Sequence, residues 1–115
     1  IDKRLIEMNF GGWEMVPWDA IPKKEIDPWM ENFVNLTVPD GESYVELAAR
    51  ASEFFEELVQ KKQSKCIVVS HSGIIRALIA QLTNTPLKNS FDVKIDYGNV
   101  SKITITDTTA VLVTL

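Results

Sequence analysis

The chain has 115 residues, of which 45% are hydrophobic, so it is within the size of one domain and can bury a core. Its net charge of −4, with the 12 basic residues scattered, argues against nucleic acid or an anionic membrane as a partner, because both bind clustered lysine and arginine. The single cysteine excludes an intramolecular disulfide and favours a reducing compartment, for which the cytoplasm is the natural expectation. No stretch approaches the roughly 20 apolar residues of a membrane-spanning helix, and no signal peptide is visible.

Glycine and proline recur in the N-terminal third of the chain, where they interrupt regular structure and favour loops and short helices. Residues 1–15 are expected to form a loop or a strand end that carries Glu7. Asp27 followed by Pro28 has the pattern of a helix N-cap with proline at the first helical position. Short helical pieces are therefore expected over residues 18–25 and 27–34.

Two longer helices are expected further along the chain. Ser43 and Glu46 have the spacing of a capping box, and apolar side chains follow them at helical intervals, which predicts a helix from about 43 to 61. A second helix is expected over 73–82, since it starts at a glycine and keeps one apolar face.

The apolar run 66–69 lies between these helices and is rich in β-branched residues, which is typical of a strand buried on both faces in a parallel sheet. The Cys66 thiol would be inert in such a strand. In the C-terminal segment apolar and polar residues alternate, which is typical of strands joined by turns. These strands are expected at 93–95, 101–106 and 110–115, with a turn at Asp107.

His71 is the only histidine, and it stands where the apolar run gives way to the second long helix, in the order Ser70-His71-Ser72-Gly73. A strand that ends in His-x-Gly before a helix directs an imidazole and the free N–H groups of the first helical turn at one point, where an anion binds readily. Sheets of α/β proteins also place ligands at the carboxyl ends of strands. The pattern therefore predicts a phosphate site; the competing interpretation is a structural histidine.

A second motif occupies residues 5–14, with the sequence Leu-Ile-Glu-Met-Asn-Phe-Gly-Gly-Trp-Glu. Together with Ser-His-x-Gly and the Pro-x-Gly-Glu-Ser segment at 39–43, it resembles the downstream half of the histidine phosphatase superfamily, which has the phosphoglycerate mutase-like fold. Within that superfamily the chain most resembles the small bacterial branch around α-ribazole phosphatase. It departs from the pattern at Met15, where relatives commonly have glycine.

The resemblance implies an α/β fold with three layers, α/β/α, and a mostly parallel sheet, of which residues 1–115 form the C-terminal portion. It also implies hydrolysis of a small phosphorylated substrate through a phosphohistidine, in cobalamin biosynthesis, with no cofactor and no metal. By the same resemblance, His71 binds the transferring phosphoryl group and stabilises its charge, and the N–H of Ser72 contacts phosphate. Glu7 takes the role of proton donor, since one carboxyl can protonate the leaving oxygen and then deprotonate water.

The Arg-His-Gly motif that carries the nucleophile in this superfamily is absent from these residues. One histidine cannot be both the nucleophile and the second histidine beside it. The chain, which starts at Ile1, is therefore expected to be part of a longer enzyme and to be inactive on its own.

Several alternatives stay open at this point. The chain could be a non-catalytic phosphate-binding or regulatory module of the same fold, or part of a phosphoglycerate mutase, and a homodimer is an open alternative to a monomer. A serine hydrolase is excluded, because the Gly-x-Ser-x-Gly spacing is absent and no second histidine remains to act as base.

The remaining conspicuous residues have simpler interpretations. Trp13, Trp18 and Trp29 are expected to pack in the core or at its rim. Arg76 is expected on the helix surface or in an ion pair rather than against phosphate. A turn followed by a helix cap fully explains residues 41–43, so no chemistry is assigned to them.

Overall fold

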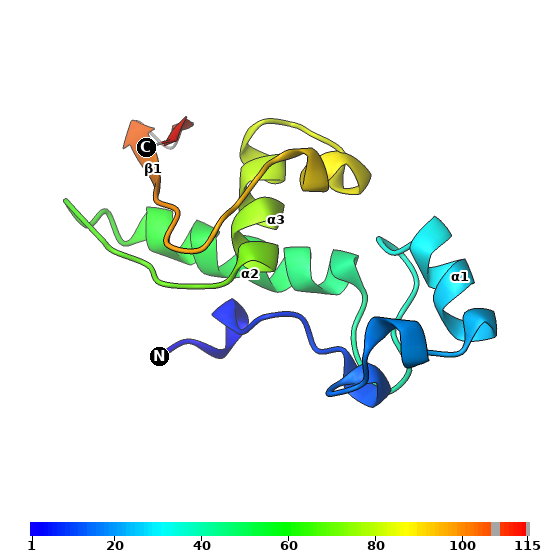
Figure 1. Ribbon diagram of the computed structural model, residues 1–115. Coiled ribbons are helices and arrows are strands. Elements are labelled where there is room, and N and C mark those ends of the chain that lie inside the picture. Colours follow the sequence, from blue (N-terminus) through cyan, green and yellow to red (C-terminus); the bar gives the residue numbers. More distant parts are fainter. Residues whose placement is uncertain (107–108, 115) are drawn as a thin grey trace.

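The computed structural model describes residues 1–106 and 109–114 and consists mainly of helices (Figure 1). In these ranges the α-helices and strands are α1 (Lys23–Glu31), α2 (Tyr44–Gln60), α3 (Ser72–Leu82), β1 (Ser101–Thr106) and β2 (Thr109–Thr114). Short 3-10 helices precede and separate them at Lys3–Leu5, Gly11–Trp13, Trp18–Ala20 and Leu87–Asp92. No helix in the described ranges combines the length and the apolarity that crossing a bilayer requires.

Helix α2 begins as its capping pattern predicts, because the Ser43 Oγ accepts a hydrogen bond from the Glu46 N–H at 3.2 Å. The apolar face of α2 packs on α3 and forms the centre of the core (Figure 1). The fully or almost fully buried residues of this interface are Leu47, Ala48, Ala51, Ile74 and Ala77. Both long helices are confirmed, each within one residue of its predicted ends.

The predicted bounds of the two short helical pieces are wrong, because a 3-10 helix covers only Trp18–Ala20 and α1 spans Lys23–Glu31. Helix α1 begins at Lys23, so Pro28 lies inside it instead of at its first position. The carbonyl of Pro22 accepts hydrogen bonds from the Glu25 and Ile26 N–H groups at 2.9 and 3.0 Å, and this starts the helix before Asp27 is reached. Pro28 then removes one backbone donor from the helix.

The apolar run 66–69 is not a buried strand in the described structure. It forms no ladder there, and Ile67 and Val69 are 92% and 88% exposed. A buried parallel strand needs partners on both sides, whereas β1 and β2 pair antiparallel with each other. The burial expected for Cys66 is wrong for the same reason, because its side chain is exposed.

The C-terminal segment contains the hairpin that its alternation predicts, with Ile103 of β1 opposite Leu112 of β2. The predicted turn at Asp107 lies outside the described residues. The strand predicted at 93–95 is wrong, since this segment follows the last 3-10 helix and pairs with no strand among residues 1–106 and 109–114. It leads instead into a loop that forms one wall of a pocket.

Candidate active site

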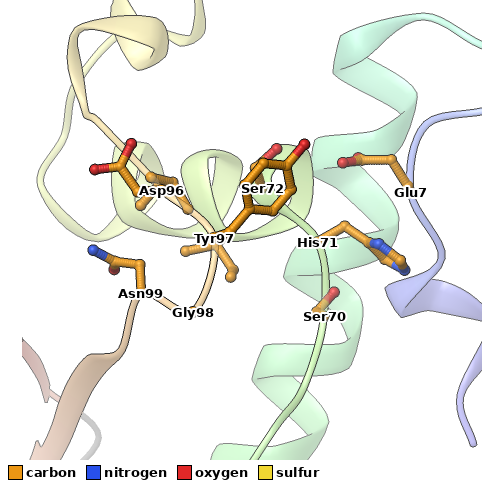
Figure 2. A pocket seen from close by; sticks show the side chains of 10 residues that line it. Glu7, Ser70, His71, Ser72, Asp96, Tyr97, Gly98 and Asn99 are labelled. Carbon is orange, nitrogen blue, oxygen red and sulfur yellow. The ribbon is translucent and has the colours of Figure 1, made fainter.

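A pocket of about 500 Å³ gathers residues from three distant parts of the chain (Figure 2). Glu7 comes from the N-terminal loop, 70–72 from the start of α3, and 95–99 from the loop before β1. The three site residues that the sequence suggests, Glu7, His71 and Ser72, therefore line one cavity. In Figure 2, Glu7 and His71 lie on one side of the start of α3, and Asp96 and Asn99 on the other.

The first turn of α3 lies at this pocket, and its N–H groups have no acceptor within the helix. His71 is the N-cap residue, with an extended backbone (φ −119°, ψ 162°), and its carbonyl accepts the Ile75 N–H at 3.0 Å. The imidazole makes no capping hydrogen bond, so it does not block the helix end. Ile74 is completely buried, which fixes the first helical turn in place. These N–H groups and the helix dipole together favour an anion.

The Glu7 carboxylate already lies at this helix end. Its Oε2 accepts the Gly73 N–H at 3.2 Å, and its Oε1 accepts the Met8 N–H at 3.0 Å. A Cβ added to Gly73 would be 2.3 Å from Glu7 Oε1, so the close approach depends on glycine. A phosphoryl group that bound the same helix end would lie directly beside the carboxylate.

One hydrogen bond and one buried side chain hold the N-terminal loop in place. The Ser70 Oγ donates a hydrogen bond to the Leu5 carbonyl at 2.9 Å. Met8, next to Glu7, is 92% buried and belongs to the core. The position of Glu7 therefore follows from packing on both sides of it.

The wall formed by residues 95–99 was not recognised in the sequence as part of a site. Gly98 has a φ of +72°, which lets the backbone turn between Tyr97 and Asn99. Arg76 supports the segment that leads to this wall, because its Nε donates to the Val93 carbonyl at 3.1 Å and its guanidinium lies 5.1 Å from the centre of the Phe91 ring. In the described structure Arg76 thus bonds to backbone and an aromatic ring, with no ion pair.

The tryptophans pack as expected. Trp13 is buried, and Trp18 stacks on Trp29 with ring centres 6.0 Å apart and an interplanar angle of 25°. None of the three is among the described residues that line the pocket.

This combination of helix N–H groups, a histidine and a carboxylate suits an anionic ligand that undergoes proton transfer. The family model of the histidine phosphatase superfamily (branch 1) matches residues 1–115, and the chain belongs to that superfamily.

Three relatives are informative. The adenosylcobalamin/alpha-ribazole phosphatase of Escherichia coli (strain K12) is 28% identical over 112 residues, which are 94% of this chain and 55% of that protein. The metal-independent phosphoserine phosphatase of Arabidopsis thaliana is 31% identical over 84 residues, which are 69% of this chain and 35% of that protein. The crystal structure of the alpha-ribazole phosphatase from Shigella flexneri matches with a TM-score of 0.89 at 28% identity, covering 100% of this chain and 59% of that one.

The chain thus spans about half the length of the curated relatives that match nearly all of it. The family match and the structural likeness support the α/β fold that the motifs suggested.

Proposed function

We propose that the chain is part of a phosphomonoester hydrolase in which Glu7 is the proton donor and His71 and the Ser72 N–H bind the phosphoryl group. The observation that carries this proposal is the meeting of the Glu7 carboxylate with the N-terminus of α3 in one pocket. In the proposed whole protein, residues 1–115 belong to a single histidine phosphatase domain. Its three layers include a mostly parallel sheet in which the apolar run 66–69 is paired.

The proposed reaction has two steps. A histidine outside these residues attacks phosphorus, an N–P bond forms, the P–O bond to the substrate breaks, and Glu7 gives its proton to the leaving oxygen. Water then attacks the phosphorus of the phosphohistidine, a P–O bond forms, the N–P bond breaks, and Glu7 takes a proton from the water. This releases phosphate and restores both the histidine and Glu7. His71 and the start of α3 stabilise the charge on the phosphoryl oxygens throughout.

The proposed substrate is a small phosphate monoester of the α-ribazole phosphate type, which would give the protein a role in cobalamin biosynthesis. This rests on the names of the relatives that cover nearly the whole chain. Phosphoserine is the second substrate to test, because phosphoserine phosphatases are also among the relatives.

The role of Glu7 is tested with Glu7→Gln in the full-length protein. Turnover of an alkyl phosphate, which has a poor leaving group, is expected to fall by roughly 10²–10⁴-fold, because the general acid is lost. Inhibition by inorganic phosphate should stay close to the wild-type value. The matched control is Glu56→Gln, at an exposed position of α2.

Two results would contradict the proposal. A wild-type rate of alkyl phosphate hydrolysis in Glu7→Gln would remove Glu7 from the mechanism. A full-length protein that binds phosphate and hydrolyses no phosphate ester would indicate the non-catalytic binding module instead.

A further inference from the structure

The loop that carries Glu7 has little regular structure, yet Arg50 of α2 holds its backbone. The Arg50 Nη1 donates a hydrogen bond to the Arg4 carbonyl at 2.8 Å, and Nη2 donates to the Glu7 carbonyl at 3.4 Å. The Arg50 side chain is 22% exposed. One guanidinium therefore fixes the backbone at Glu7 and three residues before it.

Glu42 fixes the other side of the same loop. Its Oε1 accepts the Asn9 N–H at 3.0 Å, and its own N–H donates to the Asn9 carbonyl at 3.0 Å. A Cβ on Gly41 would lie 2.4 Å from the Asn9 carbonyl oxygen, so this close approach requires glycine. The sequence explains segment 41–43 as a turn and a helix cap. In the structure this segment also holds the loop after Glu7 in place.

Arg50 and Glu42, which each bind the loop that carries Glu7, also bind each other. Arg50 binds the Glu42 carboxylate through Nη2–Oε1 at 2.6 Å and Nε–Oε2 at 3.2 Å, in a two-pronged ion pair. Arginine suits this position because its planar fork reaches two carbonyls and two carboxylate oxygens at once, which a lysine ammonium cannot do. Both side chains are largely removed from solvent, at 22% and 14% exposure, so loss of either partner leaves the other poorly compensated.

We propose that Arg50 and Glu42 are a positioning pair that aligns the Glu7 carboxylate with the phosphoryl group at the start of α3. The inference rests on the proposed role of Glu7 as proton donor. Neither residue lines the pocket in the described structure, so both act through the loop and not on the substrate. A misplacement of about 1 Å in a reacting group can lower a rate by about 100-fold, so a fixed backbone matters for this step.

A positioning role differs from simple support of the fold in what it does to different substrates. A displaced proton donor lowers kcat/KM for esters with poor leaving groups and spares kcat/KM for p-nitrophenyl phosphate, whose leaving group needs little protonation. This ratio reports the first step alone, so it excludes the later hydrolysis in which Glu7 acts as a base. A loss of folded protein would lower both rates equally. The contribution of Arg50 should also vanish once Glu7 can no longer donate a proton.

The experiment uses the full-length protein with Arg50→Lys, Glu42→Gln, Glu7→Gln and the double variant Arg50→Lys/Glu7→Gln. For Arg50→Lys and Glu42→Gln, kcat/KM on an alkyl phosphate is expected to fall about 10–100-fold, while kcat/KM on p-nitrophenyl phosphate stays close to the wild-type value. The double variant should be no slower than Glu7→Gln alone. Lys88→Ala is the control, at an exposed basic position of the last 3-10 helix.

The outcomes separate this inference from the proposed function. Losses that are equal on both substrates, or that add to the loss in Glu7→Gln, overturn the positioning role and leave the proposed function intact. A wild-type rate in Glu7→Gln overturns the proposed function and the positioning role with it. Circular dichroism and a thermal melt of each variant confirm that the rates refer to folded protein, and Glu42→Gln tests the pair independently if Arg50→Lys does not fold.

Discussion

Glu7 and Gly73 are matched to each other at the start of α3. The Gly73 N–H holds one carboxylate oxygen, and the missing side chain of Gly73 leaves room for the other. Because the group in the way of a Cβ is the end of a flexible side chain, a larger residue at position 73 would displace the carboxylate and leave the helix in place.

Gly73→Ala should therefore separate activity from stability. The new Cβ would lie 2.3 Å from Glu7 Oε1, so the carboxylate must move, and turnover of an alkyl phosphate by the full-length protein should fall as far as in Glu7→Gln. The free energy of unfolding should stay level or rise by about 0.5–1 kcal/mol, because alanine is favoured over glycine within a helix. Steady-state rates and urea unfolding measure the two effects.

Gly12→Ala is the control, since its Cβ would meet no atom closer than 3.4 Å. Full activity in Gly73→Ala would show that the Glu7–Gly73 contact has no part in turnover.

The sequence indicated Glu7, His71 and Ser72 because each stands in a short motif whose spacing is readable without the fold. Arg50 was not identified, since an arginine on the polar side of an amphipathic helix has the same pattern whether it faces solvent or a loop. The pocket wall at 95–99 was missed for a related reason, because only tertiary packing brings it beside the start of α3.

At the scale of elements, the sequence was sufficient to predict those helices and strands whose formation depends on residues near in the chain. Helices α2 and α3 and the hairpin of β1 and β2 are confirmed, since capping, periodicity and adjacent pairing are all local. The run 66–69 has the composition of a buried strand, but a strand is defined by its neighbours and the described residues offer it none. The start of α1 was mistaken because two prolines follow each other closely and either one can start a helix.

Helix α2 is tied to the last 3-10 helix by a buried hydrogen bond between Tyr44 Oη and Ser90 Oγ at 2.9 Å. Burial raises the pKa of the Tyr44 hydroxyl above its usual value of 10.0, against a smaller opposing effect of Ser90. The folded protein therefore keeps the proton at a pH where the unfolded chain loses it. The stabilisation is complete below about pH 10 and is lost as the pH rises through the folded-state pKa.

The free energy of unfolding should accordingly fall with pH above about 10, and Tyr44→Phe should reduce that slope. At neutral pH the same substitution should cost about 1–3 kcal/mol, because it leaves the buried Ser90 hydroxyl without its partner. Urea unfolding of the full-length protein at pH 7 to 11 measures both effects. Tyr97→Phe removes a hydroxyl from a fully exposed ring and should change neither. An unchanged alkaline slope in Tyr44→Phe would assign the pH dependence to other groups.

At the scale of the whole molecule, two independent facts concern what residues 1–115 can do alone. The chain spans about half the length of the relatives that match nearly all of it. It also contains a single histidine, which lies at the N-terminus of α3 as its cap. A phosphohistidine mechanism with a second histidine in the phosphate pocket needs at least one histidine more than this.

Residues 1–115 on their own should therefore bind phosphate weakly and hydrolyse no phosphate ester. The start of α3 and His71 can hold an anion, but the covalent step needs a nucleophile held against phosphorus and further positive charge on the phosphoryl oxygens. The assay uses p-nitrophenyl phosphate at mildly acidic pH without added metal, with the full-length protein as the positive control. Phosphate binding is followed in parallel by NMR, through the His71 ring signals and the amides of Ser72 and Gly73. Turnover by the isolated chain that disappears in His71→Ala would identify His71 as the nucleophile and overturn the role proposed for it.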